Sequence, residues 1–273
     1  MKKYTSLTFL IIFEAIAIGL SYLTNNIFYF YNFSYIGILL TLGIYLYSKN
    51  YKYARNFIQI AIGSYMLIYL GILSAENMMI TGFWYYLFLG VFEAAVIHYA
   101  VAKIFGPFLF GRGWCGYACW TAMILDLLPY EVPETDRKNY EYIRYIVFIV
   151  SLTLVISLFI LKISDLNTIM FYIFIGGNIL YYVIGILLAF LLKDNRAFCK
   201  YICPVTVFLK IGTYFSLLRV KYNKEKCINC NKCKNICPMN VDMCNNSRKR
   251  KNSTECILCL NCIKECPNNA LNL

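Results

Sequence analysis

The chain has 273 residues, of which 60% are hydrophobic and 18% aromatic, and its mean hydropathy is +0.58. Soluble domains average about 45–50% apolar residues, so this composition excludes an ordinary soluble protein and predicts a membrane protein with a small soluble part. The formal net charge is +12, and 15 Lys/Arg against 5 Asp/Glu lie from Lys193 onward. We expect this basic surplus to sit at a membrane surface rather than to bind nucleic acid.

Six apolar segments are long enough to cross a bilayer. They are residues 7–22, 27–47, 57–74, 81–105, 142–161 and 171–192. The predicted fold is mainly α: a polytopic membrane bundle of about six helices, followed by a soluble C-terminal part. The expected units are helices one to four (1–105), a cytoplasmic loop (106–141), helices five and six (142–192), a linker (193–221) and a C-terminal α+β domain (222–273).

Basic residues in short loops set the predicted orientation, because they stay on the cytoplasmic side. Lys49, Lys52 and Arg55 follow the second segment, and the surplus from Lys193 follows the sixth. An even number of crossings then places both termini and the loop 106–141 in the cytoplasm. Lys2 and Lys3 precede the first segment without a convincing cleavage site after it, so we interpret that segment as an uncleaved anchor in the inner membrane.

Ionisable groups inside an apolar segment are costly and usually functional. Glu93 and His98 lie in the segment 81–105, where a carboxylate and an imidazole suit a quinone site or a proton path. Glu14 and Lys103 have a plainer interpretation, which is pairing with another helix or reaching the interface. His98 is the only histidine, so a haem held by two histidines of this chain is excluded.

Two Cys-x3-Cys motifs follow apolar segments in matching sequence frames. Each has an arginine three residues before its first cysteine and an aromatic residue directly before it. The motifs, 84 residues apart, are Arg112 to Cys115 and Cys119, and Arg196 to Cys199 and Cys203. Cysteines four residues apart share one helix face, so two pairs that meet would form a four-thiolate site. The alternatives are thiol–disulfide chemistry, copper handling, or buried thiols set by packing.

The C-terminal region repeats the pattern Cys-x2-Cys-x2-Cys-x3-Cys-Pro at an offset of 29 residues. The eight cysteines are Cys227, Cys230, Cys233, Cys237, Cys256, Cys259, Cys262 and Cys266. This is the spacing of bacterial two-cluster [4Fe–4S] ferredoxins, in which the fourth cysteine ligates the other cluster. One predicted ligand set is therefore Cys227, Cys230, Cys233 and Cys266, and the other is Cys256, Cys259, Cys262 and Cys237. Zinc knuckles are the alternative, but zinc sites use two well-separated pairs.

Two further features lie between the repeated motifs. Cys244 belongs to neither frame, and we interpret it as a bystander. Residues 248–251 read Arg-Lys-Arg-Lys, which favours anionic lipid headgroups or an acidic electron donor such as a flavodoxin, or else forms a solvated loop.

From about residue 106 to the C-terminus the chain resembles polytopic membrane ferredoxins of the NapH type, whose relatives include the regulator NosR and the oxidase-assembly protein CcoG. Trp114, Cys115, Gly116 and Cys119 match the first family motif, with Trp120 where the family has proline. Residues 199–204 match the second motif in full. We identify neither the flavin-binding domain of the regulator nor the immunoglobulin-like domain of the assembly protein, so the short NapH architecture is the nearest.

The resemblance implies electron transfer between a quinone pool or a cytoplasmic donor and a redox partner, often a separate flavin or iron–sulfur subunit. The expected cofactors are two [4Fe–4S] clusters, with a third cluster at the Cys-x3-Cys pairs and a quinone as further expectations. The alternative function is a copper reductase or assembly factor that uses the Cys-x3-Cys pairs. The sequence gives no nucleotide-binding glycine loop and no direction of electron flow.

Overall fold

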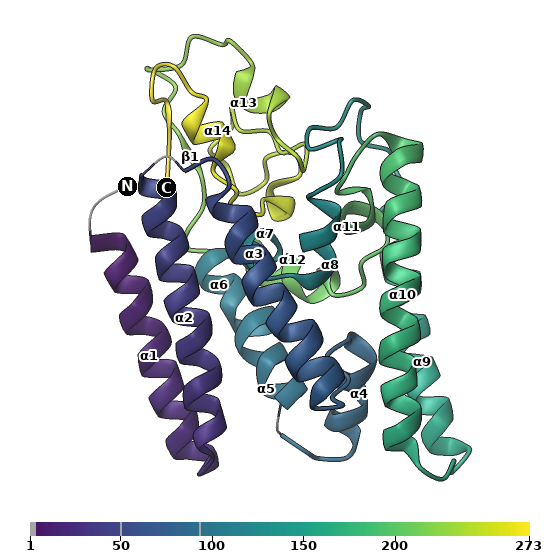
Figure 1. Ribbon diagram of the computed structural model, residues 1–273. Helices are drawn as coiled ribbons and strands as arrows, with labels where there is room; N and C mark the ends of the chain where they lie inside the picture. The colour runs from purple at the N-terminus through teal and green to yellow at the C-terminus, as the bar shows by residue number, and fades with distance from the viewer. Residues whose placement is uncertain (1–3, 50, 93) are drawn as a thin grey trace.

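A computed structural model describes residues 4–49, 51–92 and 94–273. The long helices run side by side, and the cysteine-rich segments lie together over one end of them (Figure 1). The start of α1 and the C-terminus are at that same end. The mainly helical prediction is confirmed.

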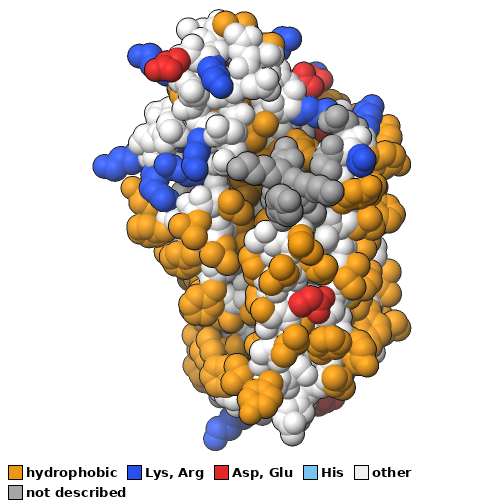
Figure 2. Space-filling model, turned by 90° about the vertical axis from the view of Figure 1, so that its left-hand side faces the viewer, with side chains coloured by type: hydrophobic (Ala, Val, Ile, Leu, Met, Phe, Trp, Pro, Cys, Tyr) orange, Lys and Arg blue, Asp and Glu red, His pale blue; other side chains and the backbone are white. Residues whose placement is uncertain are grey.

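Five helical segments of the described chain are long and apolar enough to cross a membrane. They are α1 (Tyr4–Thr24), α2 (Ile27–Ser48), α3 (Ala54–Ser64) continued by the π-helical η1 (Tyr65–Leu73), α9 (Ile143–Ile160) and α10 (Leu166–Leu192). Only 11% of the apolar stretch of α1 is buried, so its outer face is hydrophobic and uncovered. Figure 2 shows such side chains over the long helices, with Lys and Arg gathered towards the cysteine-rich end. This arrangement is compatible with a multi-pass membrane protein.

The fourth predicted span, residues 81–105, is not one helix, and this part of the prediction is wrong. Helix α4 (Ile80–Phe88) ends at Gly90, whose φ is +71°. The Gly90 amide donates to the Leu87 carbonyl (3.2 Å) and the Val91 amide to the Tyr86 carbonyl (3.0 Å), which is the Schellman arrangement that terminates helices. The composition stays apolar through this break, so hydropathy alone does not reveal it.

A new helical run begins after the break and supplies the return to the cysteine-rich end. It consists of α5 (Ala94–Tyr99), the π-helical η2 (Ala100–Phe105) and α6 (Gly106–Phe110). The predicted domain boundary at residues 105 and 106 falls inside this run. The chain thus reaches the first Cys-x3-Cys motif through a shorter apolar helix, Ala95–Phe110, than the 25-residue span that was expected.

Short elements build the cysteine-rich end. They are α7 (Gly113–Tyr117), α8 (Trp120–Leu125), α11 (Ala197–Tyr201), α12 (Thr206–Tyr214), β1 (Lys221–Tyr222), α13 (Lys232–Asn235), η3 (Ser253–Glu255), α14 (Asn261–Lys264) and β2 (Leu271–Asn272). Strands β1 and β2 pair antiparallel, with Tyr222 opposite Leu271, and so join the two ends of the region 222–273. Helix α3 packs against α7 and α8, which connects this end to the bundle.

Candidate iron–sulfur centres

The repeat at an offset of 29 residues is present in the backbone as well as in the sequence. Asn229 and Asn231 adopt left-handed φ values of 54° and 57° on either side of Cys230, and Leu258 and Leu260 adopt 54° and 64° on either side of Cys259. Asparagine tolerates this conformation, whereas it costs leucine roughly 1–2 kcal/mol. Such strain persists where the surroundings demand it. Both loops therefore share one backbone conformation around the second cysteine of their motif.

Each loop lines its own cavity, and the fourth cysteine of each cavity comes from the other motif. Cys227, Cys230, Cys233 and Cys266 line one cavity. Cys256, Cys259, Cys262 and Cys237 line the other. These are the two sets that the crossed ferredoxin rule predicts. The donors fit [4Fe–4S] groups, which take four cysteine thiolates each.

The cysteine sulfurs surround the cavities without converging on one point. Within the described ranges, no three His, Cys, Asp or Glu side chains meet closely enough to hold one metal ion. A cube binds each thiolate through a different iron, so a spread set of sulfurs suits it. Backbone amides also approach sulfur in equivalent positions, from Val241 to Cys237 Sγ (3.4 Å) and from Ala270 to Cys266 Sγ (3.2 Å). Such bonds tune the reduction potentials of iron–sulfur centres.

Cys244 lies at the first cavity. Its Sγ is 3.7 Å from the Cys233 Sγ, and it lines the cavity together with the four cysteines of that set. The repeat did not predict that Cys244 lies at this cavity, because the residue at the equivalent position of the second copy is Leu273 and not a cysteine. The site thus holds five thiols where the repeat predicts four.

The two Cys-x3-Cys motifs adopt the same local structure and meet. Helices α7 and α11 are single-turn helices offset by the same 84 residues as the motifs. The arginine of each motif donates to the first cysteine carbonyl of the other. These bonds run from Arg112 Nη2 to Cys199 O (3.4 Å) and from Arg196 Nη1 to Cys115 O (3.0 Å). This reciprocal pairing explains why an arginine stands three residues before each pair.

The four thiols of these motifs lie within electrostatic range of one another and of buried cations. Burial is the main reason that the pKa of the Cys199 thiol is raised to about 12; Arg196 opposes this rise, and the nearby sulfurs add to it. A thiol with so high a pKa does not ionise by itself at neutral pH. Lys103, 4% exposed, lies near Cys115, Cys119 and Cys203. The positive charge of Lys103 and of the two motif arginines suits a group that carries net negative charge, as a cube with four thiolates does.

The first Cys-x3-Cys motif packs directly on the second ferredoxin loop. Cys115 shares one buried cluster with Cys237, Cys256 and Cys262. A Cβ at Gly116 would lie 2.4 Å from the Ile257 carbonyl oxygen, so only glycine allows this approach. Tyr117 Oη also donates to the Leu258 carbonyl (2.9 Å). The four-thiol site of the paired motifs and the second ferredoxin cavity are consequently neighbours.

Glu255 is the buried carboxylate that joins these parts. It is 1% exposed and forms salt bridges with Arg112, Arg144 (2.9 Å), Arg137 (3.2 Å) and Lys210 (3.6 Å). Burial acts to raise the pKa of the Glu255 carboxyl, but the four cations outweigh it and hold the pKa at about 2. Glu255 directly precedes Cys256, so these ion pairs fix the second ferredoxin loop against the first motif, α9 and α12.

Asp126 has the corresponding role for the second motif. It bonds Arg196 through its Oδ1 (2.6 Å) and Arg55 of α3 through its Oδ2 (2.5 Å). The two arginines keep the pKa of the Asp126 carboxyl below its usual value despite burial. Sequence analysis singled out neither acid. Only Glu255 had a signal in the sequence: it is one of 5 acidic residues from Lys193 onward and directly precedes the first cysteine of the second ferredoxin motif.

The predicted quinone or proton site at Glu93 and His98 is untested, because Glu93 lies outside the described residues. His98 is 3% exposed and contacts the Trp114 ring edge-to-face, with centroids 4.9 Å apart. Lys103 Nζ lies 4.9 Å from the centroid of the same ring. Trp114 thus connects His98 to the segment that carries Cys115. Glu14 accepts a hydrogen bond from Ser34 of α2 (2.8 Å), in line with the plainer interpretation.

His98 also lines a cavity between α2, η1 and α5. Asn32 and Glu76 are the other polar residues there, among mainly apolar side chains such as Phe28 and Met78. Neither His98 Nε2 nor Asn32 Oδ1 has a hydrogen-bond partner in the described part of the chain. Two residues that line the cavity therefore each have a buried polar atom without a hydrogen-bond partner among the described residues.

Comparisons with known proteins agree with this geometry. A 4Fe-4S dicluster domain family matches residues 219–267, and a 4Fe-4S binding domain family matches residues 95–130 and 173–225, which contain both Cys-x3-Cys motifs. These matches support an iron–sulfur ferredoxin family. The second match begins at residue 95, just after the helix break at Gly90.

Two relatives come from Methanocaldococcus jannaschii. The chain is 27% identical over 158 residues to the uncharacterized protein MJ0749. The aligned stretch covers 54% of this chain and 59% of that protein. It is 26% identical over 175 residues to the uncharacterized protein MJ0750. Here the aligned stretch covers 56% of this chain and 73% of that protein. The chain thus spans less than two thirds of the first relative. No solved structure matches.

Proposed function

We propose that the chain is a membrane-anchored electron-transfer protein that passes single electrons between a quinone pool or a cytoplasmic donor and a redox partner. The observation that carries the proposal is the adjacency of three cysteine sets. The first ferredoxin cavity includes the exposed Cys230. Cys115 of the paired motifs shares one buried cluster with Cys237, Cys256 and Cys262 of the second cavity. We further propose that the chain is a short membrane ferredoxin of the NapH type.

Iron–sulfur clusters supply one-electron redox chemistry at these sites, and the chain supplies ligands, spacing and charge. Eight cysteines would hold two clusters in the ferredoxin region. Cys115, Cys119, Cys199 and Cys203 would hold a third, with Arg112, Arg196 and Lys103 offsetting its negative charge. Because all four thiols are buried or partly buried, the protein keeps this site away from solvent.

A quinone at the His98 cavity would complete the membrane end of the relay. The His98 imidazole is suited to exchange a proton with a quinone oxygen, and Asn32 Oδ1 to accept a bond from a quinol hydroxyl. Trp114 lies between this cavity and Cys115, which gives a short route between the two. In this proposal His98 and Asn32 form the polar end of the cavity, and Glu93 has no assigned contact.

We also propose that the cysteine-rich end faces the cytoplasm and docks a flavin or iron–sulfur partner protein. The basic residues between α2 and α3 and those after α10 support this orientation through the positive-inside rule. Protease treatment of inside-out inner-membrane vesicles tests it. We expect cleavage in the region 222–273, and protection of that region in inside-out vesicles would refute the orientation.

Iron and acid-labile sulfide analysis with low-temperature EPR tests the number of centres. We expect about twelve irons per chain in the wild type and about eight in a Cys115→Ser, Cys199→Ser variant. About eight in both would remove the third site, and four or fewer in fully loaded protein would remove the ferredoxin assignment. The same variant tests the copper-reductase alternative. Loss of copper reduction with electron transfer intact would favour that alternative.

A further inference from the structure

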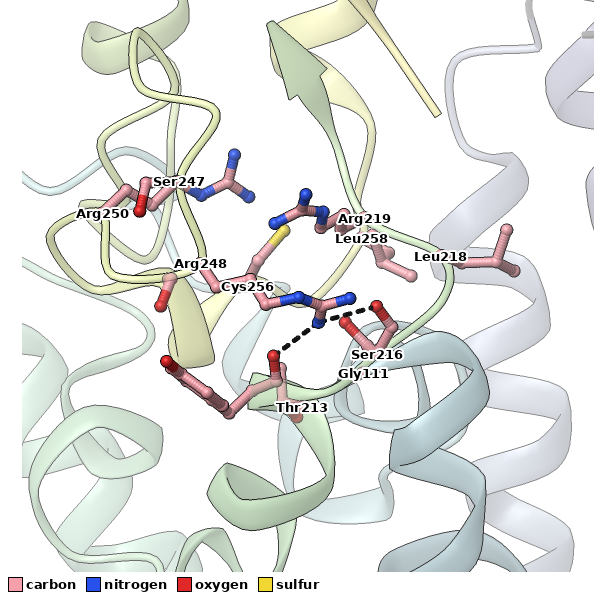
Figure 3. Close-up of a pocket in the computed structure, with 12 residues that line it drawn as sticks. Gly111, Thr213, Ser216, Leu218, Arg219, Ser247, Arg248, Arg250, Cys256 and Leu258 are labelled. Atoms are coloured by element: carbon pink, nitrogen blue, oxygen red, sulfur yellow. Dashed lines mark hydrogen bonds between the residues drawn. The ribbon is translucent and has the colours of Figure 1, made fainter.

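A pocket that adjoins the second ferredoxin cavity lies where the linker after α12 meets the loop between the two ferredoxin motifs. Arg219 comes from the linker, and Arg248 and Arg250 come from the loop. Ser216, Ser247 and Ser253 also line the pocket. Figure 3 shows three guanidinium groups gathered around the same space.

Two of the three arginines are held by backbone carbonyls rather than by acids. Arg248 Nη1 donates to the Tyr214 and Ser216 carbonyls (2.7 and 3.3 Å), and Arg250 Nη1 donates to the Val220 carbonyl (2.8 Å). In the ranges that the structure describes, none of the three forms a salt bridge. Their positive charges therefore lie around one pocket with no carboxylate of the described residues paired to them.

This arrangement is electrostatically unfavourable in the absence of a ligand. Arg250 is 5% exposed, so water screens its charge poorly. Burial together with the charges of Arg248 and Arg250 lowers the pKa of Arg219. Every other buried arginine cluster described above has a carboxylate at its centre, namely Glu255 or Asp126. These arginines are therefore available to an anion from outside the chain.

We propose that the pocket binds a phosphate group. Guanidinium groups bind phosphate oxygens through paired, charge-assisted hydrogen bonds, and serine hydroxyls add further donors. Three positive charges suit an anion with one or two negative charges. The phosphate is either that of a lipid headgroup or that of a soluble ligand, and both present the same chemistry to the arginines.

The surroundings of the pocket favour the lipid. Phe215 and Leu217 in the linker are 56% and 68% exposed, so apolar side chains stand next to the arginines at the end of the helix bundle. A headgroup at the membrane surface would place its phosphate at this level and its acyl chains against such residues.

The pocket also contacts the second ferredoxin site, because Cys256 is one of its lining residues. This part of the inference rests on the proposed function. A phosphate held here would add negative charge beside that centre, and added negative charge disfavours reduction. Binding is therefore expected to make the midpoint potential of the second cluster more negative.

Binding is tested on the full-length protein in neutral detergent by isothermal titration calorimetry with inorganic phosphate. We expect saturable binding that weakens at least tenfold in Arg219→Gln and in Arg248→Gln. The matched controls are Lys249→Gln and Lys251→Gln, since both lysines are exposed members of the same basic run and lie outside the pocket. Full affinity is expected in both controls. This readout needs no electron transfer, so it is independent of the proposed function.

Flotation with vesicles of phosphatidylcholine containing phosphatidic acid distinguishes the two sources. A lipid ligand predicts binding that free phosphate competes away and that Arg219→Gln weakens. A soluble ligand predicts phosphate binding that depends on Arg219, with vesicle binding unaffected by that substitution. The proposal is overturned if phosphate shows no saturable binding, or if the lysine variants lose as much affinity as the arginine variants.

Discussion

Replacing Glu255 with glutamine removes one negative charge from the centre of four cations while preserving the size of the side chain. The pKa of this carboxyl falls from the ordinary 4.5 to about 2 in the folded protein. Each pKa unit corresponds to about 1.4 kcal/mol, so the ionised carboxylate stabilises the folded state by about 3 kcal/mol at neutral pH. This agrees with the 3–5 kcal/mol that breaking a buried ion pair typically costs.

The loss should appear locally, at the junction between the ferredoxin region and the first Cys-x3-Cys motif. Amide hydrogen exchange in detergent measures it through the protection of η3 and α7. We expect exchange to accelerate about a hundredfold in Glu255→Gln at pH 7. The matched control is Glu134→Gln, because Glu134 pairs with Lys193 at 52% and 53% exposure and such surface pairs contribute little.

The pH dependence gives the sign of the effect. Because the folded pKa lies below the unfolded one, the stabilisation by Glu255 is fully present above pH 4.5 and is lost as the pH falls towards 2. The difference in protection between the wild type and Glu255→Gln should therefore be constant from pH 7 to 5 and shrink below that. Unchanged protection in Glu255→Gln, or an equal loss in Glu134→Gln, would show that the buried cations do not depend on this carboxylate.

Three further predictions concern the cysteine sites. Gly116→Ala places a Cβ 2.4 Å from the Ile257 carbonyl oxygen, so we expect disturbed EPR signals of the second ferredoxin centre. Gly176→Ala is the control and should leave these signals unchanged, because no heavy atom lies within 4 Å of its added Cβ. Cys233→Ser should retain more iron than Cys266→Ser, because Cys244 Sγ lies 3.7 Å from Cys233 Sγ and can take the place of that ligand. Equal iron loss in the two variants would contradict this expectation, as would a Cys233→Ser, Cys244→Ser variant that loses no more iron than Cys233→Ser alone. Arg196→Lys removes the hydrogen bond to the Cys115 carbonyl but keeps the positive charge. We therefore expect the paired-motif site to lose iron while the ferredoxin clusters stay intact, and EPR measures the signals of the centres separately.

Covalent spacing and local periodicity determined which features the sequence revealed. The crossed cysteine sets of the two cavities follow from the repeat, because ligand spacing is set by short loops. Most long apolar helices were also evident. The break at Gly90 was not, since a helix end depends on a few backbone bonds inside a segment that stays apolar. Glu255 and Asp126 were missed for another reason: each gains its role from cations that are distant in sequence, such as Arg112 or Arg55.

The arrangement of charge gives the three cysteine sites different environments. The paired-motif thiols lie among Arg112, Arg196 and Lys103, deep in the protein. The first ferredoxin cavity includes the exposed Cys230 and Ile228 and faces solvent. Buried cations favour the addition of an electron to a nearby centre, whereas water stabilises the charge of both its oxidised and its reduced state. The reduction potentials of centres at these sites therefore need not be equal. The second cavity shares a buried cluster with Cys115 and shares Cys256 with the arginine pocket, so the proposed phosphate would act on the second of the proposed centres.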